Sequence, residues 1–238
     1  MTTTSEVSVD ALTLRRDLVT CTRLLVFTQI LDYSGHVSAR IPGGDSFFIL
    51  PRDTSRAALR PEDLLEVSLD GTCAEGTPPA ESAIHAAVYR ARADVTVVCH
   101  GHPLLSTTFS MTDAPFLPMR HFACKFAEGL RVHPDPTHIT TAEQGDAVAA
   151  TLGADGAILL RSHGTVVVGD RIDVMFMDCL DLEENARTLI AARQLGGNLL
   201  PLTPAEVERV SASYARLGHR PHKTWEHYVH LGTQAGVL

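Results

Sequence analysis

The stretch Val95-Thr-Val-Val-Cys-His-Gly-His-Pro103 predicts a buried strand that ends in two histidines. Side chains alternate between the two faces of a strand, so His100 and His102 point to the same side. Gly101 between them has no side chain and lets another backbone segment or a ligand approach closely. Neutral imidazole is the commonest metal ligand, and a zinc-like ion needs three or four donors. The pair therefore indicates either a metal site or two solvated histidines at a strand end.

Composition excludes several classes of protein. The chain has 238 residues, of which 45% are hydrophobic and 20% charged, and this is typical of an ordinary globular domain. Its net charge of −8 argues against a nucleic-acid surface. No apolar run approaches the ~20 residues needed to span a bilayer, and the polar N-terminus lacks the apolar region of a signal peptide. Five scattered cysteines without CxxC spacing fit a reducing compartment. We therefore expect a cytoplasmic protein without nucleic-acid or membrane partners.

The order of the predicted elements indicates an α/β fold. Apolar periodicity predicts helices at about 13–32, 81–92, 104–111, 141–152, 173–195 and 203–217. Runs rich in β-branched residues predict strands at 37–41, 47–50, 65–69, 157–161 and 165–168, besides the strand that ends at His102. The turn Pro42-Gly-Gly-Asp45 predicts a hairpin, so the sheet is not purely parallel.

The predicted domain covers residues 1–238. We expect a flexible N-terminus at 1–12 and a C-terminal tail at 218–238. The segment 118–126 has no firm assignment. The tail holds three histidines with no predicted role, His222, His227 and His230.

A third histidine, His163, follows another predicted strand, 157–161. One close pair plus one distant histidine is how many three-ligand catalytic sites are assembled, with a position left open for substrate or water. Glu81 begins the predicted helix 81–92 and is a candidate acid/base beside the ion. Its alternative role is to stabilise the helix dipole. Whether these residues converge depends on the order of the strands.

Four segments resemble, in the same order, the class II aldolase/adducin family. They are Gly35-His-Val-Ser-Ala-Arg40, Gly76-Thr-Pro-Pro-Ala-Glu81, Ala93-Asp-Val-Thr-Val-Val-Cys-His-Gly-His-Pro103 and Leu159-Leu-Arg-Ser-His-Gly164. The resemblance spans about 15–195. It implies a three-layer α/β/α sandwich around a central, largely antiparallel mixed sheet. It also implies a homotetramer with active sites between subunits.

The same resemblance implies roles for individual residues of these segments. His100, His102 and His163 are implied as ligands of one divalent ion per subunit. Zinc is the expected ion, with manganese, iron or cobalt as alternatives. Glu81 is implied as the acid/base next to the ion.

The chain departs from the sugar-phosphate aldolases of this family at the positions that hold phosphate. Those enzymes have Gly-Asn where this chain has Gly35-His36, Thr-Gly where it has Arg52-Asp53, and two serines where it has Pro79-Ala80. The changes remove hydroxyl donors and add a guanidinium that suits bidentate carboxylate binding. A proton-donating tyrosine of the aldolases is replaced by Phe122, beside His121.

These departures predict a metal-dependent carbon–carbon lyase, a decarboxylase of an unphosphorylated, hydroxylated carboxylic acid, with an aromatic acid as the first choice. Arg52 and His36 are expected to hold an anionic group, and Glu81 or His121 to protonate the carbon that loses CO₂. The full set of expected substrate-binding residues is His36, Arg40, Arg52, Phe122 and Lys125.

Three other functions remain open from the sequence. An aldolase acting on a keto acid or sugar-derived substrate shares the enolate-like intermediate. An iron oxygenase is possible because three histidines with open positions also suit Fe(II). A non-enzymatic module like the adducin head domains is disfavoured, because all three candidate ligands are present.

Overall fold

A seven-stranded sheet forms the centre of the protein. The computed structural model describes residues 4–238, and their side chains from residue 11 onward. The strands lie in the order β3-β2-β1-β4-β7-β6-β5. Only the pairing of β5 with β6 is parallel, and the other neighbours are antiparallel. The strand bounds are β1 (His36–Arg40), β2 (Ser46–Ile49), β3 (Leu65–Ser68), β4 (Val97–Gly101), β5 (Val132–His133), β6 (Ala157–Leu160) and β7 (Gly164–Gly169).

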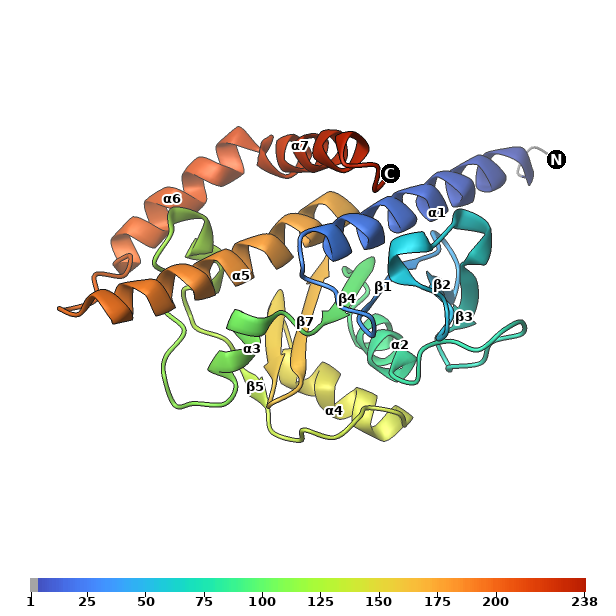
Figure 1. The fold of residues 1–238 in the computed structure, drawn as a ribbon. Helices are drawn as coiled ribbons and strands as arrows, with labels where there is room; N and C mark the ends of the chain where they lie inside the picture. Colours follow the sequence, from blue (N-terminus) through green and yellow to red (C-terminus); the bar gives the residue numbers. More distant parts are fainter. Residues whose placement is uncertain (1–3) are drawn as a thin grey trace.

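Helices cover both faces of this sheet (Figure 1). On one face lie α1 (Thr4–Phe27) and α5 (Ile172–Leu195), and on the other lie α2 (Ser82–Ala91) and α4 (Ala142–Leu152). The remaining helices are α3 (Leu104–Phe109), α6 (Pro204–Leu217) and α7 (Arg220–Gln234), with short 3₁₀ turns η1 (Arg56–Ala58), η2 (Pro61–Asp63) and η3 (His121–Phe126). The expected three-layer α/β/α sandwich with a largely antiparallel mixed sheet is confirmed.

The central strand β4 is the one predicted from the opening stretch. All five of its residues are buried, between β1 on one side and β7 on the other. A strand buried on both faces is expected to be a continuous apolar run, and Val97-Val98-Cys99 provides it. The register sets His36 of β1 opposite His100 of β4. The sheet therefore carries His100 and His102 at the end of a fully buried strand.

The structure assigns helices near both ends of the chain. Residues 1–3 of the expected flexible segment lie outside the described residues, whereas 4–12 belong to α1, which starts before residue 13 and ends at Phe27. The expected tail contains α7, in which Trp225 and Tyr228 pack edge-on against Phe176 of α5. Among the described helices, none combines the length and apolar character needed to cross a membrane.

Candidate metal centre

The three predicted histidines and Glu81 meet at one end of the sheet. His100 and His102 lie at the end of β4, His163 lies in the turn between β6 and β7, and Glu81 immediately precedes α2. One possible ligand atom from each of the four residues lies within 4.8 Å of the others. The Nε2 atoms of His100 and His102 are 3.2 Å apart, and the Glu81 oxygens lie 3.4 Å from Nε2 of His100 and of His163.

Two glycines allow the strand ends to approach this closely. A Cβ on Gly164 would lie 2.3 Å from the carbonyl oxygen of Gly101 and 2.8 Å from Cδ2 of His102. A Cβ on Gly101 would lie 2.9 Å from the carbonyl oxygen of Ile30. These contacts are shorter than carbon can tolerate, so a side chain at either position would push β4 away from β7 or from the turn that follows α1. The local sequence thus supports the convergence of the histidines.

Hydrogen bonds to the far nitrogens fix two of the imidazoles. His100 Nδ1 lies 3.0 Å from the carbonyl oxygen of Thr165, which can only accept, so Nδ1 carries the proton. His102 Nδ1 lies 3.1 Å from a carboxylate oxygen of Asp32 and donates to it in the same way. In the neutral rings both Nε2 atoms then carry lone pairs, and these lone pairs face one another. Such carboxylate and carbonyl partners are typical of metal-ligating histidines.

The negative charge of Glu81 lies beside the Nε2 lone pairs of His100 and His102. Burial acts to raise the pKa of Glu81, but the contacts with His100 and His163 and a bond from the Ile139 N–H lower it well below its usual range. Burial and the neighbouring His100 lower the pKa of His102, although Asp32 opposes this. Two lone pairs and an ionised carboxylate in contact repel one another unless a cation lies between them. The residues therefore fit a divalent ion with nitrogen and oxygen ligands.

His163 is held less tightly than the other two histidines. Its Nδ1 is buried without a hydrogen-bond partner among the described residues, although its Nε2 faces Glu81. The His102 and His163 rings are stacked with centroids 5.4 Å apart, and His138 lies edge-on to His163 at 5.8 Å. His163 is thus oriented mainly by ring packing.

A second group of buried polar side chains lies beside His100. His36, whose ring centroid is 5.1 Å from that of His100, contacts His85 of α2 through Nδ1. Ser38 and Tyr89 continue the group. Burial lowers the pKa of His36 well below its usual value and lowers that of His85 to about 3, helped in each case by neighbouring imidazoles.

The sequence offered only partial signals for these neighbours. His85 stands four residues after Glu81 and so shares its helix face, and Ser38 follows His36 by two residues on one strand face. The role of Asp32 as partner of His102 was missed. Its signal is the turn that Asp32 makes by accepting from the N–H groups of Ser34 and Gly35.

Three residues expected to bind substrate make no hydrogen bond or ion pair with the four-residue cluster. Arg40 donates to the carbonyl oxygens of Tyr89, Arg92 and Val95, which ties β1 to the end of α2. Lys125 is paired with Asp178 and Asp181 of α5. Arg52 is exposed, and its guanidinium makes no hydrogen bond or ion pair within the part of the chain that the structure describes. Their expected roles stay predictions.

His121 and Phe122 line a different cavity. This cavity, of about 1020 Å³, lies between the end of α1, η3, α5, α6 and α7. His121 is hydrogen-bonded through Nδ1 to the hydroxyl of Tyr214, and the Arg220 guanidinium lies 5.2 Å from the Phe122 ring centroid. None of the four cluster residues lines it. The structure therefore does not bring His121 together with the cluster within one chain.

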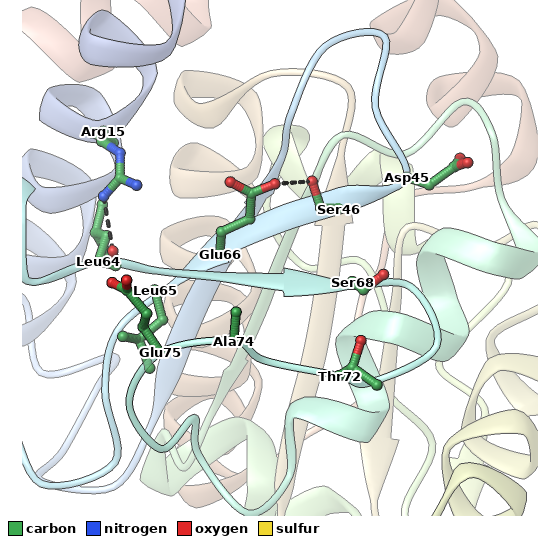
Figure 2. Close-up of a pocket in the computed structure, with 10 residues that line it drawn as sticks. All are labelled: Arg15, Asp45, Ser46, Leu64, Leu65, Glu66, Ser68, Thr72, Ala74 and Glu75. Carbon is green, nitrogen blue, oxygen red and sulfur yellow. Dashed lines mark hydrogen bonds between the residues drawn. The ribbon is translucent and has the colours of Figure 1, made fainter.

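A further pocket lies at the edge of the sheet along β3 (Figure 2). Its volume is about 590 Å³, and Arg15, Glu66 and Glu75 are among its lining residues. Ser46 donates to Glu66 across it, as Figure 2 shows. No predicted site residue lines this pocket, so it carries no part of the proposed chemistry.

Comparison with known proteins agrees with this geometry. The family model for the class II aldolase and adducin N-terminal domain matches residues 16–190, and the chain belongs to this family. One relative is the 4-hydroxy-3-prenylphenylpyruvate oxygenase/4-hydroxy-3-prenylbenzoate synthase of Streptomyces roseochromogenus subsp. oscitans. It is 32% identical over 172 residues, which cover 70% of this chain and 61% of that protein.

A second relative is named as a decarboxylase. The 3,4-dihydroxyphthalate decarboxylase of Rhodococcus jostii (strain RHA1) is 27% identical over 191 residues, which cover 73% of this chain and 77% of that protein. Among solved structures, the L-fuculose 1-phosphate aldolase of Glaciozyma antarctica PI12 superposes with a TM-score of 0.81. That match covers 96% of this chain and 93% of the other at 22% identity, so it shows a shared fold.

Proposed function

We propose that this chain is a divalent-metal-dependent carbon–carbon lyase that decarboxylates a hydroxylated, unphosphorylated carboxylic acid, with an aromatic acid as the first choice. The observation that carries the proposal is the convergence of Glu81 and the three histidines, which place one possible ligand atom each within 4.8 Å of the others. The name of the Rhodococcus jostii relative, a decarboxylase of a dihydroxylated aromatic acid, supports the reaction class. Pro79 and Ala80, which offer no side-chain donor, argue against a sugar phosphate.

His100, His102 and His163 would hold the ion, with Glu81 beside it, and we propose zinc. When bound, a divalent ion supplies Lewis acidity to the adjacent hydroxyl and carboxylate oxygens of such a substrate. Asp32 and the Thr165 carbonyl hold the His102 and His100 rings in the ligating tautomer.

Glu81 is the proposed proton carrier. In decarboxylation the bond to the carboxylate carbon breaks, CO₂ leaves, and the electron pair stays on the carbon that carried it. That carbon then takes up one proton. Glu81, ionised in its resting state, takes up one proton from bulk solvent and delivers it to this carbon, after which the carboxylate is restored. The reaction therefore consumes one solvent proton for each CO₂ that it releases.

Arg52 and His121 complete the proposal from outside the cluster. Arg52 is exposed and free of ion pairs within the described residues, so its guanidinium is available for a substrate carboxylate. His121 lies in the cavity beside α5 and α6. We propose that the chain forms a homotetramer, in which His121, Phe122 and Lys125 would act at a neighbouring subunit's site.

One alternative has a specific observation in its favour. The Streptomyces roseochromogenus relative is named as an oxygenase, and three histidines with a carboxylate also suit Fe(II). An oxygenase consumes O₂ stoichiometrically, whereas a decarboxylase of the proposed kind needs none. The two reactions therefore separate under anaerobic conditions.

The experiment follows CO₂ release from a panel of ortho-hydroxy aromatic acids and keto acids. Protein reconstituted with Zn²⁺, Mn²⁺ or Fe²⁺ is assayed in sealed vessels with and without O₂, and the products are analysed. We expect CO₂ and the protonated product in equal amounts with or without O₂. Turnover only with O₂ would establish the oxygenase, and an aldehyde product from a keto acid or a sugar phosphate would establish an aldolase.

A further inference from the structure

A chain of buried hydrogen bonds leads away from His36. Its Nδ1 lies 2.7 Å from His85 Nε2, and His85 Nδ1 lies 2.6 Å from Ser38 Oγ. Ser38 Oγ lies 2.7 Å from the hydroxyl oxygen of Tyr89, which donates to the carbonyl oxygen of Thr96 at 3.3 Å. The four side chains are almost completely buried. The chain thus connects a residue beside the candidate metal ligands to a backbone carbonyl at the other end of the β1–β4 pair.

The carbonyl at the end favours one direction for the hydrogen bonds along the chain. Thr96 O can only accept, so Tyr89 donates to it and has no second hydrogen for Ser38. Ser38 therefore donates to Tyr89 and accepts from His85 Nδ1. A neutral imidazole has one N–H, so His85 Nε2 accepts from His36 Nδ1. The opposite direction would leave the Thr96 contact without a hydrogen, because a carbonyl has none to donate.

Both rings are neutral in this arrangement. Two ring nitrogens 2.7 Å apart form a hydrogen bond only if one of them has a lone pair. Complete burial disfavours a charge on either ring, and His85 has Ser38 as its sole partner on the other side.

The remaining nitrogen of His36 is open. Nε2 makes no hydrogen bond within the described residues, and it is not among the fully enclosed polar atoms. It lies on the side of the ring away from His85. The ring is 5.1 Å from that of His100, which is opposite His36 in the β1–β4 register.

We propose that Tyr89, Ser38 and His85 are positioning residues that hold His36 in the Nδ1–H tautomer, so that its Nε2 accepts a hydrogen bond from a hydroxyl group of the substrate. This inference rests on the proposed function, which supplies the hydroxylated substrate. It differs from the expectation that His36 holds an anionic group, since a lone pair repels a carboxylate. His36 then selects substrates with an O–H beside the metal-binding oxygens.

The test reads the tautomers directly. The full-length protein, labelled with ¹⁵N-histidine and loaded with Zn²⁺, is studied by two-bond ¹H–¹⁵N correlation at neutral pH. We expect the proton on Nδ1 in both His36 and His85. In Tyr89→Phe the chain loses its last acceptor for Ser38, so Ser38 should donate to His85 and the His36 proton should move to Nε2. A His36 proton on Nε2 in the parent, or an unchanged tautomer in Tyr89→Phe, would overturn the proposal.

Binding of simple probes tests the substrate contact. Adding 2-hydroxybenzoate should shift the His36 Nε2 resonance, whereas benzoate should leave it in place. Tyr89→Phe should weaken 2-hydroxybenzoate binding about tenfold relative to benzoate, the scale of one hydrogen bond. Tyr228→Phe in α7, where the ring packs on Phe176, is the matched control and should change neither result.

Equal shifts with the two probes would refute the hydroxyl contact. Failure of the proposed function is seen separately, as absence of CO₂ release from hydroxylated acids, because the tautomer measurement requires no turnover.

Discussion

Two of the three candidate histidine ligands, and the neighbouring His36, are oriented by the contact that their second nitrogen makes. His100 Nδ1 is hydrogen-bonded to the Thr165 carbonyl oxygen and His102 Nδ1 to the Asp32 carboxylate. The Nε2 atom of each ring is therefore available to bind an ion. The Nδ1 atom of His36 is hydrogen-bonded to His85, and its Nε2 atom is left without a partner among the described residues. One residue type therefore has two proposed roles here, ligand and hydrogen-bond acceptor, and the difference comes from neighbouring groups.

At the scale of single residues, Glu81→Gln tests whether Glu81 is the proton carrier. Glutamine keeps the size of the side chain and its bond from the Ile139 N–H, but it cannot carry a proton. We expect the variant to retain metal and to lose at least ~10²-fold in kcat, as is typical for a general acid/base. Activity within a factor of a few of the parent would reduce Glu81 to a residue at the start of α2.

Arg52→Lys tests carboxylate recognition. Lysine keeps the charge but loses the paired N–H geometry, so we expect substrate binding to weaken by roughly 1–3 kcal/mol with kcat largely kept. The measurement is KM for an active carboxylate substrate. Arg209→Lys, an exposed change on α6, is the control. A KM equal to that of the parent would show that Arg52 is only a solvated loop residue.

At the scale of elements, the site depends on how closely β4 and β7 approach. Gly164→Ala would place a Cβ 2.3 Å from Gly101 O, so we expect a loss of roughly 1–3 kcal/mol in unfolding free energy and weaker metal binding. Gly156→Ala is the matched control, because a Cβ there meets nothing within 4 Å. Urea denaturation and metal titration compare the two variants. Equal stability and metal affinity in both would contradict this account of the close approach.

The elements that carry strong patterns could be predicted from the sequence. An apolar run predicts the strand at Val97–Gly101, and a run of good helix formers predicts the helix at Ser82–Ala91. Helix α7 was expected as a tail, because Arg220–Gln234 has few apolar residues and is stabilised by packing on α5.

Convergence of the site could be inferred only through the family resemblance. His163 reaches His100 because β7 pairs with β4, although two strands lie between them in the chain. No local pattern encodes that pairing. The bonds of His36 and His102 to His85 and Asp32 likewise join residues from separate elements.

At the scale of the whole molecule, the buried imidazoles link stability to pH. The folded-state pKa of His85 is about 3, below its ordinary value of 6.5, and that of His36 is also lowered. The unfolded chain therefore binds more protons than the folded one below pH 6.5. Stability is complete above this pH and is lost as the pH falls toward the folded-state values.

We expect the unfolding free energy of metal-free protein to fall between pH 6.5 and 5, by up to about 1.4 kcal/mol per pH unit for each such histidine. Urea denaturation at several pH values measures this. His85→Gln should reduce the slope, whereas His222→Gln, at an exposed position of α7, should not. A flat profile in the parent would show that these rings are not buried in the neutral form.

The metal content of purified protein tests the central claim most directly. After dialysis against metal-free buffer, elemental analysis should find one divalent ion per chain in the parent and in His222→Ala. His100→Ala, His102→Ala and His163→Ala should each lose stoichiometric metal and activity while circular dichroism shows the fold retained. Full metal occupancy in all three of these variants would contradict the metal centre and the chemistry proposed for it.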